Sequence, residues 1–430
     1  MLLAFDDTDG PGGGCTTHAL FHALLALPDL APLALPRLVR LNPNVPWKTR
    51  GNAAVAVPLG HPEGAQTRIG ELQGREILAF PEGRPAEPTP ERLEAVWNAL
   101  DNVAQGDANP AVALLPRPLP LPWAYWAAVR TVVDPPQARA DLEASGALLQ
   151  TRGDDRALVG CAAAAAWPGP PSSYELIAYR QPPQWGKPRA VEPGPLQGLD
   201  RAGITFHTTD PEEGRLACVP ATPCPVLLGL RGRDPEKLRD WGVRALGAAA
   251  REPIDGWLLW ATNQASGDHV TPVEALAEAP ELGTVHLAAT VAGMPRTRSG
   301  GHVLVDLEDP VGRAFQAAAF EPTKKFRDVV RALRPGDAVE VVGALRDATV
   351  HLEKLRVVSL AESKVKVANP TCACGDRMKS AGADAGWRCP TCGASTSEAL
   401  VEVEERGVSV GWYEVPVMAR RHLHRMAAIV

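Results

Sequence analysis

The chain opens with Leu2-Leu3-Ala4-Phe5-Asp6-Asp7-Thr8-Asp9-Gly10, which is followed by Pro11, three glycines and Cys15-Thr16-Thr17-His18. The apolar residues predict a buried strand, and the glycine run lets backbone N–H groups approach an anion. The threonine pair begins an apolar helix over residues 19–27, whose N-terminus favours negative charge and can be capped by a hydroxyl. This order predicts an α/β domain whose first turn binds phosphate.

Three carboxylates fall within this turn, at Asp6, Asp7 and Asp9. Carboxylates so close together repel one another unless a cation or a solvated loop relieves them. Oxygen ligands at the end of a strand suit Mg²⁺, so we expect Asp6 and Asp7 to bind magnesium beside a nucleotide. The plainer interpretation is a tight turn capped by threonine, which the acidic cluster disfavours.

A second loop, over residues 41–52, presents Lys48, Thr49 and Arg50 before an apolar strand. Two prolines argue against a helix here, and the two cations can neutralise a triphosphate. A basic loop tip alone is usually just solvated, but together with the acidic turn it predicts two halves of one nucleotide site. The expected phosphate contacts are Gly12, Gly13, Gly14, Thr17, Lys48, Arg50 and, from a third glycine-containing segment, Arg152.

Length and composition limit the function classes. A chain of 430 residues is too long for one ordinary core, so several domains are expected. The formal net charge is −6, so any nucleic acid must be bound by local basic patches. No apolar run is long enough for a membrane helix, and the start lacks the basic region of a signal peptide. We expect a cytoplasmic protein without membrane contact, and no motif indicates an obligate protein partner.

Four domains are expected. Residues 1–168 alternate strand-like and helix-like patterns, as in an α/β domain, and residues 169–280 resemble a small α+β sandwich. Residues 281–362 contain regularly spaced short strands, typical of a barrel of the oligonucleotide-binding type, although a barrel without a ligand is the alternative. Residues 363–430 contain a cysteine cluster and a basic tail.

The patterns also place individual elements. In the second domain we expect strands over residues 174–180, 226–230 and 256–261, and a helix over residues 235–250. In the third we expect strands over residues 285–291, 302–307, 338–345 and 350–358, with a short helix over residues 311–320.

Four of the eight cysteines cluster late in the chain, as Cys372-Ala-Cys374 and Cys389-Pro-Thr-Cys392. Two cysteine pairs around one loop predict a structural zinc site, in a segment too short and polar to fold around anything else. The first pair is one residue shorter than the usual spacing, which leaves open whether Cys372 reaches the metal. The tail over residues 420–425 is rich in arginine and histidine, and it is either an RNA contact or a solvated charged end.

Several motifs occur in a recognisable order: DDTDGPGGGCTTH, RLNPNVPWKTRGN, YELIAYR, TNQASGDH, EPTKKFR, the cysteine pairs and MARRHL. Together they resemble the archaeal-type tRNA-isoleucine 2-agmatinylcytidine synthetase family along nearly the whole chain. The resemblance implies a kinase-like ATP-binding domain, a ferredoxin-like domain, an oligonucleotide-binding fold and a zinc ribbon, with ATP, Mg²⁺ and Zn²⁺ as cofactors.

The resemblance also implies the reaction and its partners. Agmatine would be joined to the wobble cytidine, position 34, of a tRNA-Ile with a CAU anticodon, so that it reads AUA, while ATP gives AMP and phosphate. The residue expected to be phosphorylated is Thr16, which acts with the catalytic residues Asp6, Asp7 and Asp9. Agmatine is a dication, so carboxylates or aromatic faces should bind it. The candidates from the second domain are Tyr174, Glu175, Asp210 and Asp268.

The sequence departs from the family pattern at two places that concern amine recognition. One is the local sequence around Asp268, and the other is His207-Thr208-Thr209, where an Asn-rich sequence is expected. Two other function classes also stay open. Asp7-Thr8-Asp9-Gly10 after a strand fits the start of a haloacid-dehalogenase-like phosphatase, although Pro11 and the glycine run do not. A non-enzymatic RNA-binding protein would use only the barrel and the ribbon.

Overall fold

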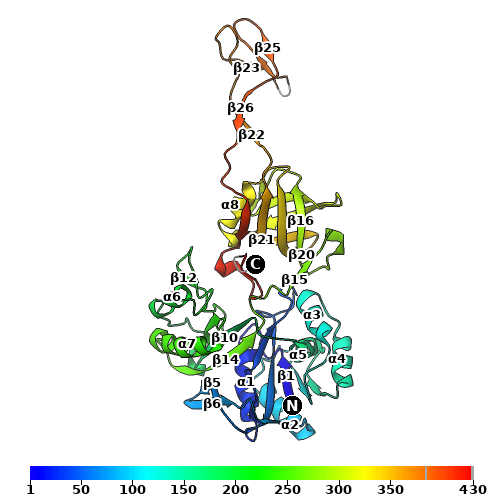
Figure 1. Cartoon of the computed structure of the whole chain (residues 1–430), viewed down its shortest axis with the longest axis vertical. Helices are drawn as coiled ribbons and strands as arrows, with labels where there is room; N and C mark the ends of the chain where they lie inside the picture. Colours follow the sequence, from blue (N-terminus) through cyan, green and yellow to red (C-terminus); the bar gives the residue numbers. More distant parts are fainter. Residues whose placement is uncertain (383–384, 428–430) are drawn as a thin grey trace.

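The computed structural model describes residues 1–382 and 385–427, which form an elongated molecule (Figure 1). A broad α/β body lies at one end, a β-barrel follows in the middle, and a slender stem carries a small ribbon at the far end. Among the described residues, no helix is long and apolar enough to span a membrane.

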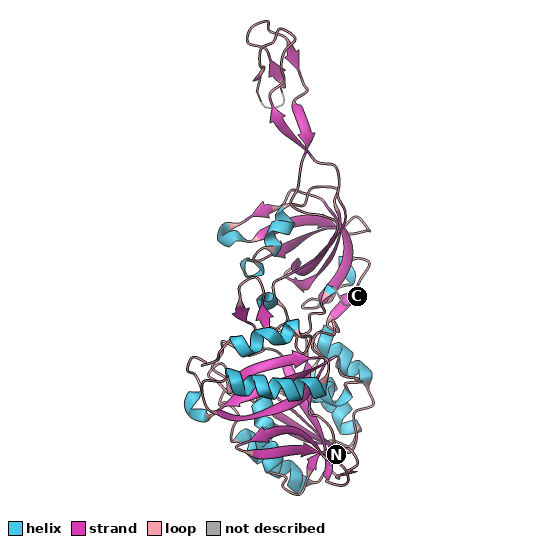
Figure 2. Cartoon of the chain, turned by 60° about the vertical axis from the view of Figure 1, so that its left-hand side comes forward, coloured by secondary structure: helices cyan, strands magenta, loops and turns pink. Residues whose placement is uncertain are grey.

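The body is built on one twelve-stranded sheet with helices packed on both faces (Figure 2). Its strands are β1 (Leu2–Asp6), β2 (Ala31–Pro32), β3 (Arg37–Arg40), β4 (Ala53–His61), β5 (Thr67–Leu72), β6 (Arg75–Ala79), β7 (Arg84–Pro85), β8 (Ala111–Leu115), β9 (Leu148–Thr151), β10 (Ser173–Arg180), β13 (Val226–Gly232) and β14 (Ile254–Thr262). Its helices are α1 (Thr16–Leu25), α2 (Pro90–Asp101), α3 (Pro122–Arg130), α4 (Pro135–Ala144), α5 (Arg156–Ala166), α6 (Gly194–Arg201) and α7 (Pro235–Ala249).

The opening strand lies inside this sheet, between β4 and β8. Leu2 and Ala4 point into a core shared with α5, while Leu3 and Phe5 point into a core shared with α1. Successive side chains of a strand alternate between faces, so a strand covered on both faces has an unbroken apolar sequence. The end of β1 therefore holds the acidic turn rigidly at the rim of the body.

The second predicted unit shares this sheet. β14 pairs in parallel with β3, and β10 lies between β14 and β13. The predicted strands and the predicted helix of this region are confirmed as β10, β13, β14 and α7. The sheet thus continues across the predicted boundary at residue 168, and a small hairpin of β11 (Thr209–Asp210) and β12 (Arg215–Leu216) lies beside it.

The middle of the molecule is a closed five-stranded barrel in which β16 pairs with both β20 and β18. Its strands are β16 (Thr284–Val291), β18 (Val303–Glu308), β19 (Ala314–Ala319), β20 (Ala338–Arg346) and β21 (Thr349–Ser359), and the elements beside them are β15 (Val270–Pro272), β17 (Arg296–Thr297) and α8 (Phe326–Arg331). The four predicted barrel strands are confirmed.

The helix predicted over residues 311–320 is wrong, because this segment contains β19. Phe315, Ala317 and Ala319 alternate into the barrel core with period two, and β19 pairs with β18 and β21. Alanine-rich sequence has high helix propensity, but packing overrides propensity in a short segment. The helix of this region is α8, which lies further along the chain.

The ribbon is an insertion in the barrel. The stem strands β22 (Lys364–Ala368) and β26 (Leu400–Val403) pair with each other, and the ribbon proper contains β23 (Lys379–Ser380), β24 (Trp387–Arg388) and β25 (Ser395–Thr396). After the stem the chain returns to the barrel, where β27 (Gly411–Glu414) pairs with β21. The last described residues then run back to the body (Figure 1).

Candidate active site and metal centre

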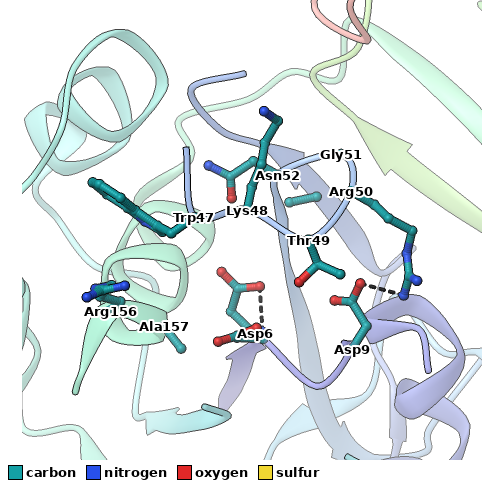
Figure 3. A pocket seen from close by; sticks show the side chains of 12 residues that line it. Asp6, Asp9, Trp47, Lys48, Thr49, Arg50, Gly51, Asn52, Arg156 and Ala157 are labelled. Carbon is teal, nitrogen blue, oxygen red and sulfur yellow. Dashed lines mark hydrogen bonds and ion pairs between the residues drawn. The ribbon is translucent and has the colours of Figure 1, made fainter. Parts of the chain in front are cut away.

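The loop between β3 and β4 lies over the end of β1 and encloses a cavity of about 90 Å³ (Figure 3). Asp6 and Asp9 lie on one side of it, and Lys48, Thr49 and Arg50 lie on the other. The two halves that the sequence predicted therefore meet in one place. The full lining is Asp6, Asp7, Asp9, Trp47, Lys48, Thr49, Arg50, Gly51, Asn52, Ala53, Arg156 and Ala157.

The carboxylates at the end of β1 are held out of water. Burial raises the pKa of Asp6 well above its ordinary value, and the charges of Asp7 and Asp9 raise it further. Burial also raises the pKa of Asp7, although the backbone N–H of Asn109 donates to its Oδ2 over 3.2 Å. A cation beside them would reverse both shifts. Two carboxylates are a donor set that fits Mg²⁺, which takes its other ligands from water and phosphate.

Asp9 connects the two loops to the first helix. Its Oδ2 lies 2.5 Å from Nη2 of Arg50, and its Oδ1 accepts a hydrogen bond of 3.2 Å from the hydroxyl of Thr16. Thr16 is buried at the first position of α1, and the hydroxyl of Thr8 donates to its Oγ1 over 3.4 Å. A carboxylate that accepts a hydroxyl proton has the geometry of a general base.

Arg50 also fastens the glycine loop. It donates to the carbonyl oxygens of Gly10, Gly13 and Gly14 over 3.3, 3.1 and 2.7 Å. Gly14 has φ +72°, and a Cβ there would meet Asp9 Cα at 3.2 Å, so only glycine fits this position. The glycine loop thus borders the site, but Gly12, Gly13 and Gly14 do not line the acidic cavity.

The helix that follows is not capped as the sequence suggested. Its N-cap is Cys15, whose backbone is extended, and no side chain caps the helix. The hydroxyl of Thr17 instead lies 3.0 Å from Sγ of Cys15. The threonine hydroxyls therefore do not cap this helix.

Arg152 is not in the cavity. Its guanidinium donates to the carbonyl oxygens of Gln105 and Ala108 and pairs with Asp101 at 2.7 Å, so it holds the loop after α2. The neighbouring Arg156, from the same segment, lines the cavity and lies over the ring of Trp47 at 5.2 Å. Sequence reasoning did not single out Trp47, Asn52 and Arg156 as cavity residues, although all of them lie within segments that it had selected.

A larger cavity of about 450 Å³ adjoins the acidic one and shares Asp6, Trp47, Asn52 and Arg156 with it. Its other walls are largely apolar and come from α3, α4 and α5 and the loops beside them. Its volume lies in the range of small-molecule sites.

The four residues expected to bind the amine are not among those that line the acidic cavity. Glu175 is buried between Arg40 and Arg231, at 3.5 and 3.2 Å. Tyr174 packs against the body core beside it.

The other two carboxylates also have partners. Asp268 accepts a hydrogen bond of 2.5 Å from the hydroxyl of Tyr125, and Asp210 accepts backbone N–H groups of Glu212 and Met418 at 2.9 and 3.1 Å. Each carboxylate of this group is thus already engaged within the protein.

The four clustered cysteines form a candidate metal centre. Sγ atoms of Cys372, Cys374, Cys389 and Cys392 all lie within 4.8 Å of one another, and none is in a disulfide. Tetrahedral ligands at a Zn–S distance of ~2.3 Å stand roughly 3.8 Å apart, so this donor set fits zinc. Cys372 belongs to the cluster despite its short spacing, at 3.4 Å from Cys392. Within the described residues, no other group places three or more potential ligand atoms so close together.

The basic tail is docked rather than solvated. Leu423 is 1% exposed and belongs to the core of the body, and its carbonyl accepts the N–H of Gly267 over 2.9 Å. The carbonyl of His422 accepts the N–H of Ala265 over the same distance. Glu414 at the end of β27 accepts from Arg420 and His424 over 3.1 and 3.2 Å.

The fold and these sites define a class: a multidomain α/β protein that combines an acidic pocket under a cationic loop with a closed barrel and a four-cysteine ribbon. Comparison with known proteins narrows this class. The TiaS TCKD domain matches residues 2–152, the TiaS FLD domain matches residues 155–269, and the TiaS C-terminal zinc ribbon domain matches residues 369–408.

The chain belongs to the TiaS family of tRNA-isoleucine 2-agmatinylcytidine synthetases. It is 36% identical to the synthetase of Methanopyrus kandleri over 100% of this chain and 96% of that one. It is 34% identical to the synthetase of Methanosarcina mazei over 98% of this chain and 96% of that one. A solved complex of TiaS with its isoleucine tRNA and ATP is 32% identical and superposes with a TM-score of 0.84 over 100% of this chain and 97% of that chain. The resemblance inferred from the motifs is confirmed.

Proposed function

We propose that this protein joins agmatine to the wobble cytidine of a tRNA-Ile with a CAU anticodon, forming 2-agmatinylcytidine at the expense of ATP. The observation that carries the proposal is similarity over the whole chain, body, barrel and ribbon together, to synthetases of this name. Relatives of 30–32% identity have been solved with their isoleucine tRNA and ATP, and with the same tRNA, AMPCPP and agmatine.

The domain roles in this proposal follow the family. Residues 1–168 would be the kinase-like ATP-binding domain, residues 169–280 the ferredoxin-like domain, residues 281–362 the oligonucleotide-binding fold, and residues 363–430 the zinc ribbon with the tail.

The chemistry needs an activated carbonyl. The 2-oxygen of cytosine is a poor leaving group until phosphate esterifies it; the amine of agmatine then attacks C2, and the C–O bond breaks as phosphate departs. Asp6 and Asp7 would hold Mg²⁺, which neutralises charge on the phosphates, while Lys48 and Arg50 offer further positive charge.

Thr16 would carry the transferred phosphate. Its hydroxyl already donates to Asp9, so Asp9 is positioned to take the proton as the oxygen attacks. Thr17, the glycine loop and the uncapped start of α1 lie beside it as backbone donors for phosphate oxygens. The 450 Å³ cavity has room for a nucleoside next to Asp6.

The candidates for agmatine binding are the four residues of the second domain region, Tyr174, Glu175, Asp210 and Asp268. Glu175 is balanced by two arginines, so it would contribute through that network rather than as a free negative charge.

The test is conversion of purified tRNA-Ile with a CAU anticodon by the protein with ATP, Mg²⁺ and agmatine, read by mass spectrometry of the digested tRNA. Cytidine should gain agmatine, whereas spermidine, putrescine and lysine should react poorly. Thr16→Ala should abolish transfer of labelled γ-phosphate to the protein, while Thr89→Ala, at the cap of α2, should not. Unmodified cytidine under all conditions would refute the proposal.

The two other function classes find no support. A phosphatase of the haloacid-dehalogenase kind would have no use for the barrel and ribbon, and a non-enzymatic RNA-binding protein would have none for the acidic pocket. Release of phosphate from a simple monoester without tRNA would favour the phosphatase class.

A further inference from the structure

A third cavity, of about 190 Å³, lies between the Lys48–Asn52 loop and the C-terminal tail, on the other side of this loop from the acidic cavity. The loop forms a wall of the acidic cavity and of this one, because Lys48, Arg50, Gly51 and Asn52 line both. The side chains that line the third cavity include no carboxylate, and the cations among them are Arg40, Lys48, Arg50, Arg420 and Arg421. We call it the cationic cavity.

Three of these cations are neutralised by carboxylates outside the cavity. The pairs are Arg40 with Glu175 at 3.5 Å, Arg50 with Asp9 at 2.5 Å and Arg420 with Glu414 at 3.1 Å.

The other two cations, Lys48 and Arg421, are neutralised less completely. Within the described residues Lys48 has no carboxylate partner, and its Nζ donates only to the carbonyl of Val45 over 3.4 Å. Arg421 is 43% exposed, and its Nε lies 3.8 Å from Glu353, which His269 already contacts at 3.2 Å.

These two positive charges act on each other. Burial, and then the charges of Arg421 and Arg346, lower the pKa of Lys48. Arg346 ends β20 of the barrel, and its Nη2 donates to the carbonyl of Asn44 over 3.0 Å. The charges of Arg421 from the tail and Arg346 from the barrel thus both act on Lys48, although Arg346 does not line the cavity. Like charges held close together favour an anion between them.

The cavity is held in shape by a close contact. A Cβ at residue 51 would lie 2.9 Å from both Arg40 Nη1 and the ring of His422, so only glycine lets the loop approach the tail this closely. The backbone bonds of His422 and Leu423 to the body fix the tail next to it. The backbone of the loop and of the tail is therefore preorganised, and an incoming anion need order only the side chains of Lys48 and Arg421.

We propose that the cationic cavity binds a backbone phosphate of the tRNA next to the nucleotide that is modified, and that Arg421 and Lys48 position it. The inference rests on the proposed function and names the residues that bind its RNA substrate. A cavity of 190 Å³ is smaller than a site for a whole small molecule, and it suits a phosphate with part of its sugar.

The phosphate could also belong to ATP. Two observations favour RNA. Arg420 and Arg421 come from the tail that follows the ribbon, whereas the predicted magnesium ligands Asp6 and Asp7 line the other side of the loop. A phosphate placed here would hold its strand across the loop, with the neighbouring nucleotide directed toward the other side of the loop.

The test measures tRNA affinity as a function of salt for Arg421→Gln and for Arg421→Lys, with Arg244→Gln, an exposed arginine of α7, as the matched control. Each phosphate contact contributes ~0.7–0.9 to the slope of log K against log salt. Arg421→Gln should weaken tRNA binding about tenfold at low salt and reduce the slope by about one, Arg421→Lys should recover most of both, and Arg244→Gln should change neither. The concentration of ATP for half-maximal labelling of Thr16 should stay the same in all three.

Two results would overturn the inference. An unchanged salt slope in Arg421→Gln would remove the phosphate contact, and an equal loss of ATP affinity would assign the cavity to the triphosphate. Failure of the proposed function looks different: the wild-type protein would not convert the tRNA, while Arg421→Gln would still weaken RNA binding. Thermal melting of each variant verifies that the tail stays docked.

Discussion

At the scale of single residues, Asp9 is the point where the loops and the first helix meet. It pairs with Arg50 and accepts the hydroxyl of Thr16. We expect Asp9→Asn to lower the rate of phosphate transfer to Thr16 by ~10²–10⁴-fold, the range for loss of a general base. Single-turnover labelling of Thr16 measures it.

The control for this variant is Asp29→Asn, which removes an exposed carboxylate paired with Arg92 at 3.0 Å in the same domain. Its rate should match that of the wild-type protein. An Asp9→Asn variant that labelled Thr16 at full speed would remove Asp9 from the proton transfer.

Gly51 is also important among single residues, because the side chains around it leave little room for a Cβ. The structure shows a close approach of Gly51 to the ring of His422. We expect Gly51→Ala to destabilise the protein by ~1–3 kcal/mol, the cost of overpacking, and to weaken tRNA binding as well. Thermal unfolding and tRNA affinity test both effects.

Gly106→Ala is the matched change, because a Cβ there meets nothing within 4 Å. It should leave both the melting temperature and the tRNA affinity unchanged. Equal effects of the two variants would mean that the contact between Gly51 and His422 is unimportant.

At the scale of elements, β27 and the tail depend on one carboxylate. Burial alone would raise the pKa of Glu414, but the hydrogen bond and charge of His424, and then the charge of Arg420, lower it to about 2. A carboxyl whose pKa is lower in the folded state stabilises that state above its ordinary pKa of 4.5, and this stability is lost as the pH falls toward 2.

We therefore expect acid to loosen the tail between about pH 4.5 and 2. Glu414→Gln should remove about 1–2 kcal/mol of stability at pH 7, a figure reduced for solvent screening of a partly exposed pair. It should also flatten the acid dependence of the melting temperature. Glu402→Gln, on the exposed stem, is the control, and an acid profile identical in both variants would contradict this role of Glu414.

At the scale of the whole molecule, the ribbon is an insertion and the tail is not part of it. Removing residues 366–430 would delete the ribbon together with β27, Glu414 and the docked tail. Replacing residues 364–403 with a short flexible turn would delete the stem and ribbon alone, because β21 and β27 are already paired beside each other.

The two deletions should behave differently. The internal deletion should weaken tRNA binding and leave ATP-dependent labelling of Thr16 intact. The terminal deletion should in addition lower the melting temperature and disturb the loop at Gly51. Zinc chelation should reproduce the internal deletion, since a four-thiolate segment folds around its metal. Equal loss of ATP-dependent labelling in both deletions would show that the ribbon supports the whole fold.

Patterns within the chain predict the parts of this protein that depend on neighbours in the sequence. The strand that ends in Asp6, the acidic turn, the cationic loop and the four cysteines were all predictable, because periodicity, turn chemistry and ligand spacing are local signals. The motif order also identified the family. Local signals failed at β19, where alanine-rich sequence predicted a helix and barrel closure demanded a strand.

Residues far apart in the sequence become neighbours through packing, which the three-dimensional structure reveals. It placed Arg152 in a supporting role and Arg156 in the pocket, surrounded Glu175 with arginines, and brought Arg421 and Arg346 to Lys48. These outcomes depend on how the sheet, the barrel and the returning tail pack together, and long-range packing sets which charges are buried and which partners neutralise them. No spacing within one segment carries that information.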